Sequence, residues 1–314
     1  MSYLYVNDGT GQFSAGSSVF IGMQPRGMEI DDFNQDGFPD VIVCNLQSDD
    51  VTLLLNDGDG HFVVGSTIDW GRKVCILDVN SDGNADIFHG AHGTSTALFL
   101  GDGTGNFNAV ESEILTAVEC ANSVVAADFN SDGKVDLVVG SKNNEAIIGW
   151  LENPKNSRDT AAWKLHPLAQ ASWIMSIQSV DLDGDNHSDI LYSDRFGKQA
   201  GIYWLKNPGQ TSTTWKRQLI GAQDKQVMFL TTGKLSPTDK VPTIVCATLD
   251  GELVCCKADK GNAWKETTLP LPFGLKAGKG VAIADINGDH RPDLVTTSES
   301  QREKDDMVAV SWKE

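Results

Sequence analysis

Residues 32–43 read DFNQDGFPDVIV, and four later stretches repeat the same pattern. The copies are DVNSDGNADIF from residue 78, DFNSDGKVDLVV from residue 128, DLDGDNHSDIL from residue 181 and DINGDHRPDLV from residue 285. Each copy joins two apolar runs through a short loop with Asp at its first, fifth and ninth positions. Self-similarity at a period of about 50 residues indicates a repeat architecture in which each repeat is one supersecondary unit.

A second motif follows each loop, as in LLLNDGDGHF at residues 53–62 and LFLGDGTGNF at residues 98–107. Asn-Asp-Gly and Gly-x-Gly tips favour tight turns between antiparallel strands. A sixth, degenerate copy combines LTTGKL at 230–235 with TIVCA at 243–247 and lacks the acidic positions. Each repeat therefore contains four strands, A to D, with the Asp loop between A and B, which is typical of a β-propeller blade. The sequence predicts an all-β fold, a single β-propeller domain over residues 1–314.

The number of blades has two interpretations. Residues 3–13, YLYVNDGTGQF, match a C–D hairpin, so the chain has six A-strand repeats plus an N-terminal C–D hairpin. Either the N-terminal strand D closes the last blade, or the chain is a trimmed piece of a seven-bladed parent.

The Asp loops have the composition of a calcium site. Carboxylates or amides stand at positions 1, 3, 5 and 9, and a Gly stands at or just before position 6. Calcium takes six to eight oxygen ligands, and a backbone carbonyl at position 7 usually completes such a loop. An EF-hand is excluded because position 12 carries no Glu in any copy. The five loops hold 16 Asp residues, and such crowding of like charges favours a bound cation.

The Asp-x-Asn-x-Asp-Gly-x-x-Asp loop followed by LLLNDGDGHF resembles the FG-GAP/VCBS repeat family, which includes the propeller of integrin α chains, propeller lectins and propeller modules of polysaccharide-processing enzymes. The resemblance implies about five structural Ca²⁺ sites. The implied ligands are Asp32, Asn34, Asp36, Phe38 and Asp40; Asp78, Asn80, Asp82, Asn84 and Asp86; Asp128, Asn130, Asp132, Lys134 and Asp136; Asp181, Asp183, Asp185, His187 and Asp189; and Asp285, Asn287, Asp289, Arg291 and Asp293, where the position-7 residue offers its carbonyl. The loop at 233–243 is expected to bind no metal, because Asp239 is its one carboxylate.

Composition excludes several classes of partner. The net charge is −18, and an acidic surface repels a phosphate backbone, so nucleic acid is not expected as a partner. No apolar window is long enough to insert in a membrane, and no signal peptide stands at residue 1. The six cysteines lie mostly in strand-like runs and are expected to pack as buried thiols. The family resemblance favours an extracellular, secreted or cell-surface location.

The face opposite the Asp loops is the expected ligand surface, since loops on a rigid scaffold commonly carry function. Basic, aromatic and imidazole groups fall in the D–A and B–C connections that form this face. The candidate ligand-binding residues are Arg26, Arg72, Lys73, His89, His92, Trp173 and Arg195. Aromatic stacking combined with a guanidinium fork suits a neutral or acidic glycan.

Three functions follow from this pattern. The leading interpretation is a carbohydrate-binding or adhesion module without catalytic activity, and no catalytic residue is assigned. The second is a polysaccharide lyase or related sugar-processing enzyme that uses His89 or His92 with Arg26, Arg72 or Arg195. The third is a scaffold that displays loops to a protein partner.

Overall fold

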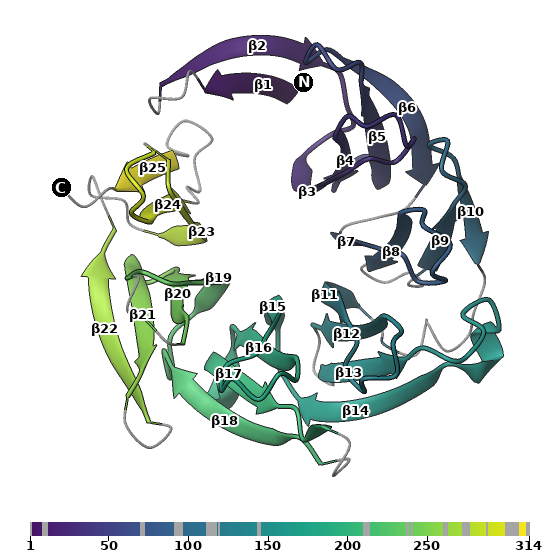
Figure 1. The fold of residues 1–314 in the computed structure, drawn as a ribbon. Coiled ribbons are helices and arrows are strands. Elements are labelled where there is room, and N and C mark those ends of the chain that lie inside the picture. Colours follow the sequence, from purple (N-terminus) through teal and green to yellow (C-terminus); the bar gives the residue numbers. More distant parts are fainter. Residues whose placement is uncertain are drawn as a thin grey trace. The chain divides into compact units, whose positions relative to one another are not determined.

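The structure is a computed structural model, and its described residues form an all-β protein (Figure 1). The described residues are 2–7, 12–69, 73–90, 97–110, 118, 120–142, 146–209, 214–236, 239, 241–259, 263–271, 277–286, 288–298 and 308–311. The helical segments among them are two short 3₁₀ turns, Thr160–Ala162 and Gly197–Gln199. No helix in these ranges is long and apolar enough to cross a membrane.

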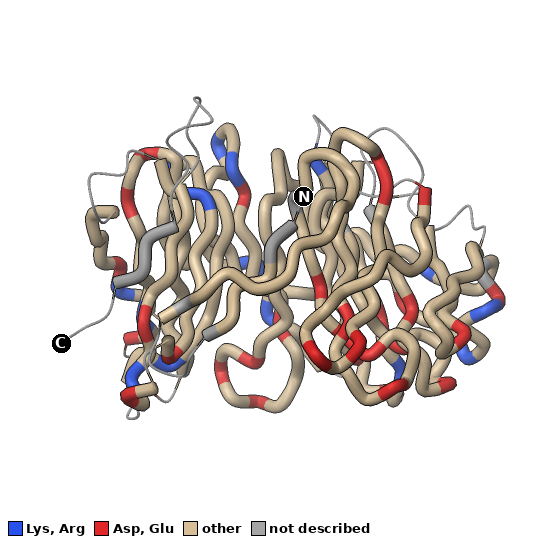
Figure 2. The backbone as a smooth tube through the Cα atoms, turned by 90° about the horizontal axis from the view of Figure 1, so that it is seen from above, with Lys and Arg blue, Asp and Glu red and all other residues tan. Residues whose placement is uncertain are grey.

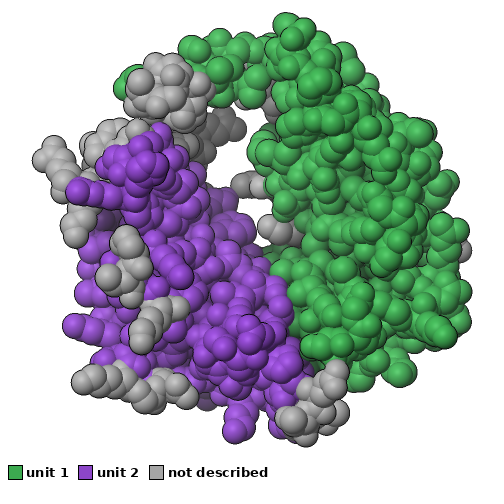
Figure 3. Space-filling view, viewed as in Figure 1, with its two compact units in different colours: residues 1–8, 12–142, 147–168 green, residues 9–11, 143–146, 169–314 purple. Residues whose placement is uncertain are grey.

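The chain divides into two compact units, coloured separately in Figure 3. Unit 1 comprises residues 1–8, 12–142 and 147–168, and unit 2 comprises residues 9–11, 143–146 and 169–314. The single domain expected over residues 1–314 stays a prediction.

Unit 1 contains one hairpin and three four-stranded antiparallel sheets. The hairpin pairs β1 (Ser2–Asn7) with β2 (Phe13–Val19). The sheets are β3 (Pro25–Asp31), β4 (Asp40–Asn45), β5 (Asp50–Asn56) and β6 (Phe62–Asp69); β7 (Lys73–Leu77), β8 (Asp86–Gly90), β9 (Ala97–Gly101) and β10 (Phe107–Val110); and β11 (Ala121–Ala127), β12 (Asp136–Ser141), β13 (Ile147–Glu152) and β14 (Lys164–Gln170), whose last two residues belong to unit 2.

Unit 2 continues the same pattern with three sheets. They are β15 (Ile174–Val180), β16 (Asp189–Asp194), β17 (Gly201–Lys206) and β18 (Lys216–Gly221); β19 (Val227–Gly233), β20 (Thr243–Thr248), β21 (Glu252–Ala258) and β22 (Trp264–Pro270); and β23 (Gly278–Ala284), β24 (Asp293–Ser298) and β25 (Val308–Ser311). The last sheet has three described strands.

The second strands of the four-stranded sheets are buried almost throughout, and consecutive sheets within each unit pack face to face. In unit 1, Ile42 and Leu53 of one sheet form a buried cluster with Val74 and Ile87 of the next. In unit 2, Leu191 and Val254 belong to a comparable cluster. Within each unit the first strands of neighbouring sheets also contact each other, β7 with β3 and β11, and β19 with β15 and β23. These four-stranded antiparallel blades confirm the β-propeller fold class expected from the sequence.

The cysteines mainly occupy these cores. Cys44, Cys246, Cys255 and Cys256 are buried in strands, as expected for thiols that pack as small apolar side chains.

Candidate functional site

Each Asp loop is held by backbone N–H groups that point at its first aspartate. In the loop after β3, the carboxylate of Asp32 accepts hydrogen bonds from the N–H of Asp36 at 3.1 Å and of Gly37 at 2.9 Å. Asp78, Asp128, Asp181 and Asp285 accept equivalent bonds in the later loops. The loops are thus folded around carboxylate oxygens, each of which keeps lone pairs for another partner.

Two residues in every loop adopt a left-handed backbone conformation, at positions 4 and 6. In the first three loops Gly37, Gly83 and Gly133 occupy position 6, with φ of 90°, 85° and 85°. In the last two loops Gly184 and Gly288 occupy position 4, while Asn186 (φ 66°) and His290 (φ 64°) occupy position 6. The expectation of Gly at or just before position 6 is therefore corrected: one of two left-handed positions, 4 or 6, is Gly in each loop.

The ninth aspartate links the loop to the end of the third strand. Oδ2 of Asp40 accepts the N–H of Phe33 at 3.1 Å, and Oδ1 accepts the N–H of Asn56 at 2.8 Å. Asp86, Asp136 and Asp189 repeat both bonds, and Asp293 repeats the first. All five are buried.

Burial has an electrostatic consequence at these ninth positions. It raises the pKa of Asp86, Asp136 and Asp189 to about 6, and it also raises the pKa of Asp40. A nearby cation would oppose this shift, because an opposite charge favours the ionised carboxylate.

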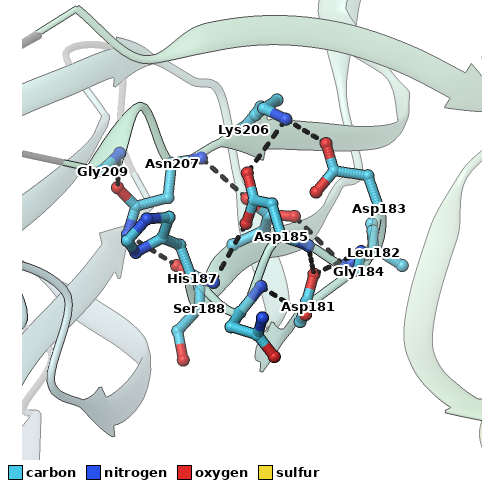
Figure 4. Close-up of polar contacts among 12 residues, drawn as sticks. Asp181, Leu182, Asp183, Gly184, Asp185, His187, Ser188, Lys206, Asn207 and Gly209 are labelled. Atoms are coloured by element: carbon cyan, nitrogen blue, oxygen red, sulfur yellow. Dashed lines mark hydrogen bonds and ion pairs between the residues drawn. The ribbon is translucent and has the colours of Figure 1, made fainter. Parts of the chain in front are cut away.

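The loop at 181–189 brings three carboxylates together, and Figure 4 labels two of these residues, Asp181 and Asp183. Carboxylate oxygens of Asp181, Asp183 and Asp189 all lie within 4.8 Å of one another. This loop alone carries Asp rather than Asn at position 3, which explains why its cluster is the most acidic. Lys206 Nζ makes an ion pair with Asp183 and another, at 3.1 Å, with Asp185. The ammonium group of Lys206 thus lies at the edge of the acidic cluster.

The donor set fits a hard cation. Positions 1, 5 and 9 offer carboxylates and position 3 an amide or carboxylate, which are the oxygen ligands that calcium prefers. The position-7 residues are also ordered, since their N–H groups bond to the position-5 carboxylates; these residues are Phe38, Asn84, Lys134, His187 and Arg291. Asn287 lies outside the described residues. In Figure 2 the Asp-rich loops appear as red segments of the backbone tube.

A cluster of aromatic and cationic groups lies at the other end of the fourth repeat. The register pairs Ile174 with Asp194 and Val180 with Asp189, so residues 173 and 195 stand at the end of β15 and β16 remote from the Asp loop. Seven strand residues separate the two ends, a distance of about 20 Å.

Trp173 and Arg195, two of the predicted ligand-binding residues, meet at this remote end. The Arg195 guanidinium carbon lies 4.6 Å from the ring centroid of Phe196 and 5.8 Å from that of Trp173. The two rings meet edge to face at 5.3 Å. Asp194 is buried and accepts the N–H groups of Ser172 and Trp173, both at 2.9 Å, which fixes the backbone beneath the rings. We call Trp173, Arg195 and Phe196 the aromatic–arginine cluster.

One predicted ligand residue has a different environment. His89 does not lie in a B–C loop; it belongs to strand β8, is buried, and stacks on Phe99 at 5.5 Å. The reason is that β8 is the second strand of its sheet, in which residues on both faces are covered: Ile87, Phe88 and His89 are all buried. Arg72 and His92 lie outside the described residues, and for Arg26 and Lys73 the described part is the backbone in β3 and β7.

Sequence reasoning missed Phe196 and Lys206. Phe196 directly follows Arg195, so its place beside the predicted Trp173 could have been inferred from the B–C loop. Lys206 ends the third strand of its repeat, and the ninth aspartate anchors that strand end to the Asp loop. The place of Lys206 at the end of the third strand could therefore have indicated that it lies near the Asp loop.

Comparisons with known proteins agree with the repeat. The FG-GAP-like repeat model matches residues 32–89, 78–139 and 128–192, a continuous span of just over half of the chain. Cartilage acidic protein 1 of Xenopus tropicalis is 27% identical over 129 residues, which are 40% of this chain and 20% of that protein. The Mus musculus protein of the same name is 27% identical over 130 residues, with the same shares. The chain thus aligns with about a fifth of the length of these curated relatives.

Among solved structures, the chain is similar to one described as the crystal structure of BBS1N in complex with ARL6DN, soaked with lead. The TM-score is 0.44 and the identity 10%, over 95% of this chain and 94% of that one. The family assignment comes from the repeat itself, because the matched span begins at Asp32 and contains four of the five Asp loops. The chain belongs to the FG-GAP-like repeat family.

Proposed function

We propose that this protein is a calcium-stabilised β-propeller module that binds carbohydrate and has no catalytic activity of its own. Support for calcium comes from the oxygen donors of the five Asp loops and the close approach of Asp181, Asp183 and Asp189. Membership of the FG-GAP-like repeat family supports an extracellular or cell-surface location.

The observation that carries the carbohydrate proposal is the aromatic–arginine cluster. Phe196 is 36% exposed and Trp173 is half-buried, so each ring has both a packed and a solvent-facing part. A sugar ring stacks on an aromatic face, and a guanidinium group binds a carboxylate or paired hydroxyls through its fork. A glycan with an acidic or neutral sugar fits this combination of groups.

The test is a glycan array with uronate-containing and neutral glycans in the presence of calcium, followed by affinity measurements on variants. Trp173→Ala and Arg195→Ala should each weaken binding at least about tenfold, since a lost stacking contact or charge-assisted hydrogen bond costs roughly 1–3 kcal/mol. Phe20→Ala is the matched control, because Phe20 is 74% exposed and lies in unit 1. Equal affinities in all three variants would refute the glycan site.

The enzyme alternative has less support. A lyase that uses His89 needs this side chain at the surface, whereas the ring is buried against Phe99. The scaffold alternative predicts a protein ligand at the same loops, and it would be favoured if the array gave no binding.

A further inference from the structure

Four repeats share one backbone hydrogen bond at the end remote from the Asp loop. In each of them, the residue directly after the second strand donates its N–H to a carbonyl in the connection that precedes the first strand. The bonds run from Leu46 to Gln24 at 2.9 Å, from Lys142 to Cys120 at 3.2 Å, from Arg195 to Trp173 at 2.9 Å and from Leu249 to Gln226 at 3.1 Å. Trp173 and Arg195 therefore occupy a pair of places that recurs along the chain.

The fourth repeat differs from the others at this pair of places. It has Trp173 and Arg195 where the other three have Gln or Cys bonded to Leu or Lys. The backbone differs as well, because Gln24 and Cys120 have φ of 53° and 54°, whereas Trp173 does not adopt a positive φ. A bulky side chain is disfavoured at positive φ. The connection that carries Trp173 therefore needs a different support from the one in the first and third repeats.

That support is the buried carboxylate of Asp194, the last residue of β16. Its Oδ2 accepts the N–H of Ser172 and its Oδ1 accepts the N–H of Trp173, both at 2.9 Å. Burial raises the pKa of this carboxyl group, and hydrogen bonds from the N–H groups of Trp173, Ser172 and Phe196 oppose the rise. One carboxylate thus binds the backbone of both aromatic residues of the aromatic–arginine cluster.

The equivalent residues of the other three repeats bond in a different direction. Each pairs with the first residue of the first strand, as Asp194 pairs with Ile174; they are Asn45, Ser141 and Thr248. Their side-chain hydrogen bonds join them to the third strand: Asn45 to Thr52 at 2.9 Å, Ser141 to Ile147 at 2.9 Å and Thr248 to Glu252 at 3.1 Å. In the fourth repeat this residue is an acid, and it binds the connection before the first strand instead.

We propose that Asp194 is the positioning residue of the glycan site, the group that holds the Trp173 ring in place for stacking. The inference rests on the proposed function, because it concerns how that same site is held. Asp194 is buried, so it acts through Trp173 and Phe196 without touching the sugar. A Thr at this place, as in the fifth repeat, would offer one oxygen where Asp194 uses two.

The test is a double-mutant cycle between Asp194→Asn and Trp173→Ala. Affinity is measured in calcium, well below the melting temperature, for two probes, tetragalacturonate and cellotetraose. Asn keeps the size of the side chain but places an NH₂ group against one of the two N–H donors. Asp194→Asn should weaken binding about tenfold in the wild-type background and less than about twofold in the Trp173→Ala background, because residues that act together have non-additive effects.

Thr248→Ala is the matched control. It removes a buried side-chain hydrogen bond at the equivalent place of a repeat that has Gln226 and Leu249 instead of the Trp and Arg. It should lower the melting temperature and leave the affinity for both probes unchanged, which separates positioning of the ring from a general loss of stability.

A measurement without ligand follows the ring itself. The protein is labelled with fluorotryptophan, and Trp173→Phe assigns the fluorine resonance of Trp173. This resonance should shift or broaden in Asp194→Asn and stay unchanged in Thr248→Ala.

Two results would overturn the proposal. They are an unchanged Trp173 resonance in Asp194→Asn, and equal weakening by Asp194→Asn in the two backgrounds of the cycle. If neither probe binds the wild-type protein, the proposed function fails for these glycans, and the Trp173 resonance still decides whether Asp194 positions the ring.

Discussion

The loop at 181–189 and the loop at 234–242 connect the same kind of strands but differ in chemistry. Val180 pairs with Asp189 across the first loop, and Gly233 pairs with Thr243 across the second. All six residues of β16 and all six of β20 are buried. The first loop carries four aspartates, whereas the second has Asp239 alone. The strands therefore form through continuous burial of the second strand on both faces, with or without an acidic loop before it.

The ninth position shows what the acid contributes. Asp189 and Thr243 occupy equivalent places and are both buried. Asp189 accepts the N–H of Leu182 at 3.1 Å and of Asn207 at 2.7 Å. It therefore has two roles, as a candidate metal ligand and as a brace between loop and third strand. Variants can separate these roles.

Of these changes, calcium removal should have the largest effect on stability. A ligand bound only to the native state stabilises by about 2.7 kcal/mol per site at hundredfold excess over Kd. We expect excess chelator to lower the melting temperature strongly, and calcium to restore it better than magnesium, which demands a small octahedral site. Calorimetry with EGTA, calcium and magnesium measures this. A melting temperature that does not change in excess chelator would contradict the calcium sites in the Asp loops.

Asp189→Thr should have the second-largest effect on stability. It replaces the ninth aspartate of the acidic loop with Thr, the residue at the equivalent place in the degenerate loop. Two buried N–H groups lose a carboxylate acceptor, which should cost about 2–4 kcal/mol. Denaturant unfolding in chelator at pH 8 measures the hydrogen-bonding role of Asp189 without a contribution from bound metal. The control is Thr243→Val, which keeps the shape of the side chain and removes a buried hydroxyl that has no hydrogen-bond partner among the described residues, so stability should fall by less than about 1 kcal/mol. Equal effects of the two changes would contradict the brace.

Lys206→Ala should alter metal affinity rather than the fold. The hydrogen bond to Asp183 raises the pKa of Lys206, so its charge stays at the rim of the cluster across the physiological range. Removing a competing charge that is 36% exposed should tighten calcium binding at this loop by several-fold, the size of a surface ion pair of up to about 1 kcal/mol. Calcium titration measures it. The control is Lys257→Ala, because the Lys257 ammonium lies 3.6 Å from Asp239 of the degenerate loop, and this change should leave calcium affinity unchanged. Weaker calcium binding after Lys206→Ala would contradict the expectation and show that the lysine supports the loop.

The sequence predicted the elements that depend on local pattern and missed those that depend on packing. The Asp loops and their flanking strands follow from a repeated spacing, so the sequence was enough to assign Asp181 and Asp189 to one loop between two strands. Trp173 and Arg195 could be brought together because the topology puts B–C and D–A connections at one end of a blade. His89 could not be placed, since a histidine in the sequence looks the same in a loop and near the end of a strand.

The smallest effect concerns the backbone of the acidic loop. Asn186 holds φ of 66° at position 6, where the first three loops have Gly. A side chain in this region costs roughly 1 kcal/mol, although Asn tolerates it better than most residues. Asn186→Gly should therefore change the free energy of unfolding by no more than about 0.5 kcal/mol in either direction, because Gly also loses more entropy on folding. Gly184→Ala, at φ 78° with no atom within 4 Å of the added Cβ, should instead destabilise by about 1–2 kcal/mol through backbone strain alone. Chemical denaturation in chelator compares the two variants. If Gly184→Ala proved as neutral as Asn186→Gly, position 4 would tolerate any residue, and the requirement for one Gly at position 4 or 6 would be wrong.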